Sequence, residues 1–166
     1  MTLNDFFAGC SEILAAENNP VGRSKVARLL ESALKDDAVM AEAFAGDAPE
    51  RKVLYEDPKL GFCVVAHNYL RAKVSPPHDH GPSWAIYGQA RGETIMNDWD
   101  LVEPATPTKP GRVRKSRDYK LTPGVAHVYN EGVLHSPSRL APTRLIRIEG
   151  RNMDTVQRLS YEPVAA

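Results

Sequence analysis

The residues with the clearest capacity for chemistry are two histidines that are one position apart. His78 and His80 flank Asp79, and residues two apart in an extended chain point to the same side, so both imidazoles can reach one metal ion. Pro76 and Pro77 stiffen the chain just before the pair. Because solvated strands produce the same pattern by chance, the pair by itself is weak evidence, and its surroundings must decide.

The spacing around this pair resembles the first sequence motif of the cupins, G-x5-H-x-H-x3/4-E-x6-G. Ala85 stands where that motif has its glutamate, and Gly92 follows at the spacing of its last glycine. Ala72 replaces its first glycine. By this resemblance, the two histidines occupy the positions of cupin metal ligands, and the usual carboxylate ligand is missing.

The second cupin motif, G-x5-P-x-G-x2-H-x3-N, is resembled further along the chain. The positions concerned are Gly124, Asn130, Gly132, His135 and Arg139. Asn130 takes the place of the motif's proline, and Arg139 takes the place of its final asparagine. Both motifs occur in order within residues 60–150, and the resemblance implies a cupin β-barrel in which His135 is the third histidine ligand.

The missing glutamate changes the charge of the expected site. A divalent ion held by His78, His80 and His135 keeps its full charge and open coordination positions, and such a site attracts an anionic substrate. Among cupins, three-histidine iron sites are associated with thiol dioxygenases and with dioxygenases that cleave diketones and hydroxyketones. The resemblance therefore implies an Fe(II) dioxygenase that binds O2 and a small anion. Zinc, manganese, nickel and copper are the alternative metals.

Thiol dioxygenases of the cysteine dioxygenase type resemble this chain most, through residues 77–80 and 129–135 and through the helices before the barrel. In the animal enzymes the position of Ala85 holds a cysteine that crosslinks to a tyrosine, which alanine cannot do. Leu145, Arg147 and Glu149 stand where that family has serine, histidine and tyrosine. These departures argue against a strict cysteine dioxygenase.

Two other functions remain open. A cupin isomerase or lyase would use zinc, manganese or nickel as a Lewis acid, with Glu93 or Glu149 as the base. The lack of a carboxylate at Ala85 weighs against it. The other is a non-catalytic cupin that binds a small molecule, and the absence of a helix-turn-helix or other output segment from the sequence weighs against that function.

Three further residues are candidates for catalytic roles. Arg147 shares a strand face with Glu149, and its parallel donors suit a substrate carboxylate; an ion pair between the two on the outer surface is the alternative. His127 is expected to be either a hydrogen-bonded barrel residue or a partner of the ligands or the substrate. Tyr129 is expected to line the pocket or to be plain core. The alternative anchors for an anion are Arg71, Arg144 and Lys52.

The elements that position these residues change in character near residue 50. Before it, apolar residues recur at helical spacing over 26–34, and residues 3–16 and 38–45 also indicate helices. From Val53 onward, short apolar runs are broken by proline and glycine about every ten residues, which is typical of β-structure. The expected strands cover residues 52–55, 61–71, 83–90, 92–101, 112–121, 125–130, 133–140, 143–149 and 155–161.

These elements predict a mainly β protein, a cupin double-stranded β-helix or jelly-roll barrel with an N-terminal helical layer. Residues 1–48 are expected to form the helical segment and residues 49–166 the barrel. With 166 residues in total, the two segments are expected to make one domain.

Composition limits the partners. Lys plus Arg and Asp plus Glu number 21 each, so no overall field attracts nucleic acid. No apolar stretch approaches the roughly 18 residues of a membrane span, and the first residues lack an apolar signal region; we therefore expect no membrane and a cytoplasmic location. Cys10 and Cys63 are expected to be buried, inert thiols. The expected partners are a small-molecule substrate and O2, and a homodimer is compatible with the sequence.

Overall fold

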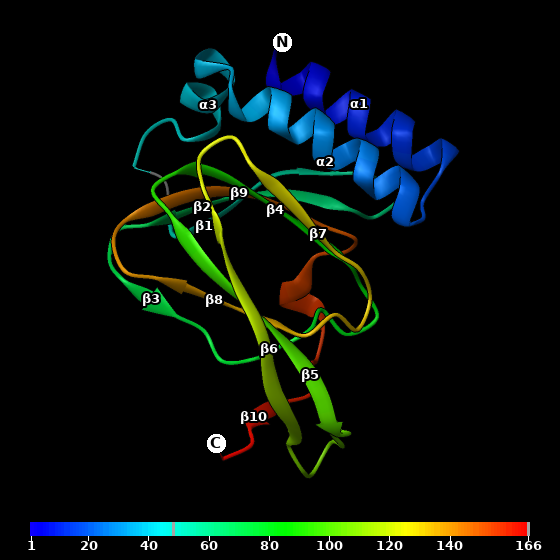
Figure 1. Ribbon diagram of the computed structural model, residues 1–166. Helices are drawn as coiled ribbons and strands as arrows, with labels where there is room; N and C mark the ends of the chain where they lie inside the picture. Colours follow the sequence, from blue (N-terminus) through cyan, green and yellow to red (C-terminus); the bar gives the residue numbers. More distant parts are fainter. Residues whose placement is uncertain (48, 166) are drawn as a thin grey trace.

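The computed structural model describes residues 1–47 and 49–165, and it has a mainly β fold with helices at its N-terminal end (Figure 1). The elements in these residues are α1 (Leu3–Ala16), α2 (Pro20–Leu34), α3 (Asp37–Ala43), β1 (Arg51–Glu56), β2 (Cys63–Tyr69), β3 (Lys73–Val74), β4 (Ala85–Arg91), β5 (Thr94–Glu103), β6 (Gly111–Leu121), β7 (Ala126–Tyr129), β8 (His135–Arg139), β9 (Thr143–Glu149), the 3-10 helix η1 (Met153–Thr155) and β10 (Tyr161–Pro163). Over the described residues, no helix has the length and apolar character that crossing a membrane would require.

The strands form two five-stranded sheets. One has the order β1-β2-β9-β4-β7 and the other β10-β6-β5-β8-β3, and the described pairs are antiparallel except β6 with β10. From β6 to β9 each successive strand lies in the opposite sheet. Antiparallel strands that alternate between two sheets in this way make a jelly roll. The expected jelly-roll barrel with an N-terminal helical layer is confirmed.

Each helix begins at a residue that caps its free backbone amides. Thr2 caps α1 in a capping box with Asp5. Asn19 caps α2 directly before a proline, and Asp36 caps α3. The first helix has the predicted bounds, and the third starts one residue before the prediction and ends two residues before it.

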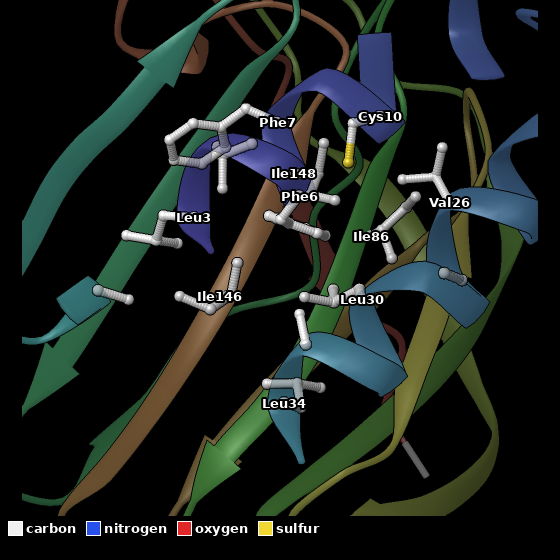
Figure 2. Packing of buried hydrophobic residues seen from close by; sticks show 14 of the residues in the cluster. Leu3, Phe6, Phe7, Cys10, Val26, Leu30, Leu34, Ile86, Ile146 and Ile148 are labelled. Atoms are coloured by element: carbon white, nitrogen blue, oxygen red, sulfur yellow. The ribbon is translucent and has the colours of Figure 1, made fainter. Parts of the chain in front are cut away.

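The main apolar core lies between the helices and the outer face of the first sheet. Figure 2 shows Phe6 of α1 and Leu30 of α2 packed in one cluster with Ile86 of β4 and Ile146 of β9, all almost completely buried. Gly88 of β4 permits this close approach, because a Cβ atom there would lie 2.6 Å from the Leu30 side chain. The helical layer therefore packs directly on the barrel.

The other face of this sheet forms the interior of the barrel. Because side chains alternate along a strand, Tyr87 and Arg147 point inward, opposite to their neighbours Ile86 and Ile146. The apolar cluster inside the barrel is smaller than the one under the helices; it consists of Ala85, Tyr87, Met96, Leu121 and Tyr129, with Tyr119 against it. The interior consequently has room for polar side chains.

The structure differs from the expected strands at two places after the helices. The predicted strand at 155–161 is wrong: Asn152 caps the 3-10 helix η1, and β10 begins only at Tyr161. The short strand β3 was not predicted, because two exposed residues give no periodic signal. The expected boundary between the helical and barrel segments falls at residue 48, which lies outside the described residues, as does residue 166.

Asp57 organises the turn between β1 and β2. Its Oδ1 accepts hydrogen bonds from the backbone N–H groups of Lys59 (2.9 Å) and Leu60 (2.8 Å). Its Oδ2 accepts from the hydroxyls of Ser11 (2.6 Å) and Tyr55 (3.1 Å). The bond from Ser11 contributes most, and together the four bonds outweigh burial and lower the pKa of Asp57 to about 2. Since Ser11 belongs to α1, this carboxylate also joins the helical layer to the barrel.

We expect Asp57→Asn to lower the free energy of unfolding by about 1–3 kcal/mol at neutral pH, because hydrogen bonds to a charged acceptor are lost. The stabilisation is complete above the unfolded-state pKa of about 3.9 and is lost as the pH falls through the folded-state pKa of about 2. Urea unfolding at pH 7 and pH 3 should show a smaller difference from wild type at the lower pH. The exposed Asp100→Asn is the control, and a wild-type value for Asp57→Asn at pH 7 would contradict the expectation.

Candidate metal centre

Three histidines meet at one end of the barrel interior. The ligand atoms of His78, His80 and His135 all lie within 4.8 Å of one another. His80 and His135 are buried, and His78 is half-buried. Two backbone hydrogen bonds, from His78 N to His135 O (3.0 Å) and from His135 N to His78 O (2.9 Å), hold two of the three side by side. The structure thus brings together the three residues that the sequence singled out.

The backbone around the histidines sets which ring nitrogen is free. His78 Nδ1 lies 2.8 Å from the carbonyl of Pro76, and His135 Nδ1 lies 3.0 Å from the carbonyl of Val133. A carbonyl only accepts, so each Nδ1 carries the hydrogen and each Nε2 keeps a lone pair for a metal. His80 Nε2 and His135 Nε2 are 3.3 Å apart. Two nitrogens about 2.0–2.1 Å from a tetrahedral zinc ion are separated by roughly 3.3–3.4 Å, so the residues fit a metal ion.

The environment keeps these imidazoles uncharged. Burial lowers the pKa of His78 to about 4. Burial, reinforced by the neighbouring imidazoles, lowers the pKa of His80 and of His135 well below the ordinary value. A metal binds the neutral form of histidine. At neutral pH no proton therefore has to leave these rings before a metal can bind.

Within the described part of the chain, no carboxylate completes the group. Among the described histidine, cysteine and acidic side chains, the set that could share one ion contains the three histidines alone. Ala85, at the position of the cupin glutamate, lies in the interior cluster. Glu149 is fully buried but is paired with Arg147 Nη2 (2.6 Å) and Arg51 Nη2 (3.1 Å).

A cavity of about 260 Å³ opens beside His78. Four cationic side chains are among its lining residues, and none of the lining residues is acidic; the four are Lys73, Arg139, Arg147 and Arg158. Arg139 is only 2% exposed, and its guanidinium lies 4.3 Å from the centre of the Tyr69 ring. Its Nε has no hydrogen-bond partner among the described residues, and burial lowers its pKa. A buried cation without a carboxylate partner makes this cavity suited to a small anion.

Arg147 points into the barrel and lines this cavity, which is one of the two orientations that the sequence left open. Its Nη1 donates to the Tyr87 hydroxyl (3.3 Å), and its Nη2 pairs with Glu149. Burial opposes the charge, but Tyr87 and Glu149 outweigh it and raise the pKa of Arg147. The pair with Glu149 is therefore present inside the barrel and not on the outer surface.

Tyr129 and His127 occupy different places relative to the histidine group. Tyr129 is fully buried, and its ring stacks on His135 with centroids 4.0 Å apart. His127 is half-buried and lies behind it, with 4.7 Å between the ring centroids of His127 and Tyr129. Burial lowers the pKa of His127. Only Tyr129 of the two contacts a candidate ligand.

Two residues beside the site were missed as functional candidates. In the sequence, Arg139 stands out only as a departure from the second cupin motif, and Tyr87, like Tyr129, is expected to line the pocket or to be plain core. Arg139 is four positions after His135 on β8, and Tyr87 is two positions after Ala85 on β4. Even spacing along a strand was the available signal, because it places each of them on the inward face.

The helical layer holds the loop that precedes β8. Arg23 of α2 makes two hydrogen bonds to the Glu131 carboxylate (2.6 and 2.7 Å) and one to Asn130 Oδ1 (2.9 Å). Its guanidinium also lies 5.1 Å from the centre of the Trp84 ring. Because His135 follows this loop, the contact fixes the start of the ligand-bearing strand.

Among known proteins, only solved structures are similar to this chain. No family model and no curated protein matches the sequence. KdgF from Halomonas sp. is similar with a TM-score of 0.47 and 21% identity over 67% of this chain and 88% of that one. A cupin superfamily protein from Desulfitobacterium hafniense has a TM-score of 0.46 and 10% identity over 66% and 87%. A cupin-2 domain protein from Shewanella frigidimarina has a TM-score of 0.45 and 12% identity over 72% of this chain and 96% of that one.

Proposed function

We propose that this chain is a metal-dependent enzyme that acts on a small anionic molecule, and more specifically a non-haem Fe(II) dioxygenase for a thiol or a diketone or hydroxyketone. The observation that supports this proposal is the position of the three histidines beside a cavity lined by four cations. Three neutral histidines leave the positive charge of a bound ion in place, and the four cations add to it. Both features favour the binding of a negatively charged substrate.

Each group of residues would have a different role, according to its position in the site. His78, His80 and His135 would hold the ion, which when bound supplies the binding and activation of O2. Arg139 would hold the anionic group of the substrate, with Arg147 beside it. The buried rings around the histidines keep bulk water away from the reacting end of the cavity. His127 and Tyr129 would act indirectly, through the packing behind His135.

An isomerase or lyase is the second candidate, and it needs a general base. Glu93 is exposed and pairs with Lys120 (2.9 Å). Glu149 is paired with two arginines. Neither acidic group lines the cavity beside the histidines. A reaction in which oxygen chemistry replaces a carboxylate base therefore agrees better with the described residues.

Oxygen consumption tests the proposal. Protein loaded with Fe(II) under anaerobic conditions is mixed with O2 and with 3-mercaptopropionate, cysteine, acetylacetone or the neutral 2-mercaptoethanol. We expect uptake of one O2 per substrate consumed, with both atoms of labelled O2 in the product, and a clear preference for the anionic compounds. Turnover of a substrate by zinc-loaded protein without O2 uptake would favour the isomerase or lyase, and no uptake with any compound of the panel would contradict the dioxygenase.

A further inference from the structure

Tyr87 lies as close to two of the candidate metal-binding nitrogens, those of His80 and His135, as these two nitrogens lie to each other. Its hydroxyl oxygen is 3.2 Å from His80 Nε2 and 3.4 Å from His135 Nε2, while the two nitrogens are 3.3 Å apart. These three atoms form a nearly equilateral triangle. Neighbouring ligand atoms on a tetrahedral ion are separated by roughly 3.3–3.4 Å, so the phenol oxygen has the spacing of a ligand.

The position of Tyr87 on β4 explains how it reaches this point. Ala85 has the place of the cupin glutamate, and Tyr87 follows it two residues later on the same inward face. The Tyr87 side chain is long enough to reach the histidines from this position, two residues beyond Ala85. An alanine at the first position leaves the interior free of a competing carboxylate.

Packing fixes the ring in this orientation. Tyr87 is 2% exposed, and its ring meets the rings of His80, Tyr129 and His135 edge to face, with centroids 5.2–5.9 Å apart. Arg147 Nη1 donates to its oxygen from the cavity side (3.3 Å). A phenol oxygen that accepts this hydrogen bond keeps a second lone pair that can face a metal.

We propose that Tyr87 is the fourth protein ligand of the metal and supplies, as a phenolate, the negative charge that Ala85 cannot supply. On binding, the phenol O–H bond breaks, the proton leaves to solvent, and an oxygen–metal bond forms; no electron is transferred. Arg147 is then a positioning residue for the ligand, and Arg139 is the buried cation of the cavity that has no ion pair with a described residue. This inference rests on the proposed metal site and adds a ligand to it; a divalent ion bound to one phenolate still carries a net positive charge, which an anionic substrate would meet.

Ferric ion is the probe, because phenolate bound to Fe(III) absorbs visible light through charge transfer and histidine ligands do not. The full chain loaded with Fe(III) should be coloured, with tyrosinate vibrations in resonance Raman spectra. Tyr87→Phe should bind the same amount of iron and lose the colour, and Tyr129→Phe should keep it. Tyr129 is the matched control, since it is equally buried and its hydroxyl bonds to Tyr119 (2.6 Å) and not to a histidine.

Zinc affinity, measured by competition with a chromophoric chelator, gives a second readout. We expect Tyr87→Phe to weaken zinc binding at least 10-fold and Tyr129→Phe to change it less than 3-fold. Iron-loaded wild type without colour, or colour that persists in Tyr87→Phe, would overturn the assignment of Tyr87 while leaving the histidine site intact. A wild-type chain that binds neither metal would overturn the metal site itself.

Discussion

Alanine in place of His80 or His135 should abolish metal retention. Wild-type protein dialysed after loading should keep about one ion per chain, because several protein side chains bind the ion together, and each variant should keep almost none. The loss should exceed the roughly 10- to 100-fold in affinity that follows removal of an outer partner of a ligand, because a bond to the ion itself disappears. His78→Ala should behave in the same way, since its ligand atom belongs to the same 4.8 Å group. Metal per chain, measured by elemental analysis, checks all three.

His127→Ala is the matched control. It also removes a half-buried imidazole from the barrel interior, but Tyr129 separates this ring from the histidine group. We expect it to keep the ion. Circular dichroism and the apo-protein melting temperature should be recorded for every variant, so that a folding defect is not mistaken for a lost ligand. If His127→Ala loses the ion while His135→Ala retains it, the assignment of the third ligand is wrong.

Most strands could be predicted because proline and glycine separate the apolar runs of the barrel. The prediction failed where the local signal was short or ambiguous. The segment 155–161 contains apolar and β-branched residues, but its first residue is the end of the helical turn that Asn152 starts by accepting from the N–H of Asp154, and β10 begins only at Tyr161. Such side-chain capping competes with strand formation. No periodicity within 155–161 reveals it.

The histidine group was predictable because its members lie at the spacing of two motifs. What the sequence could not provide was which face of β9 is the inside. Ile146 and Ile148 alternate with Leu145, Arg147 and Glu149, and a strand with one wet face would put the isoleucines in the barrel. Here the helices cover the outer face, so the isoleucines pack under them and the arginine turns inward. The side that the helices cover is a tertiary property.

For a related reason, the sequence could not identify Arg139 as a buried cation without an ion pair among the described residues. Its importance depends on which arginines already have partners, and Arg147 and Arg51 both share Glu149. The alternation of side chains along β9 already placed Glu149 on the same face as Arg147. On the neighbouring strand β2, Cys63 lies beside Glu149, with its Sγ 3.6 Å from the Glu149 carboxylate. Ion pairing inside the barrel therefore determines which of the described arginines lacks a carboxylate partner, and only the assembled strands show that pairing.

Methionine in place of Arg139 should weaken the binding of a carboxylate-bearing ligand about 10- to 100-fold, the equivalent of the roughly 1.5–3 kcal/mol of hydrogen bonds to a charged group. The test uses cobalt-loaded protein, whose visible spectrum responds to a ligand on the metal. It compares 3-mercaptopropionate with 2-mercaptoethanol, which lacks the carboxylate. Binding of the neutral thiol should not change. The unfolding free energy should stay the same or rise, because a buried, unpaired charge is replaced by an apolar side chain of similar length.

Arg158→Met is the control for this experiment. Arg158 lines the same cavity but is exposed, so its attraction for an anion is screened by salt. We expect it to weaken 3-mercaptopropionate binding less than about 3-fold at physiological ionic strength, where exposed charges interact by only about 0–1 kcal/mol. An equal loss for both thiols in Arg139→Met would mean that the arginine only supports the cavity wall. Undiminished binding of 3-mercaptopropionate would move the anchor to Arg147, whose Nη1 would then have to exchange the Tyr87 hydroxyl for the carboxylate.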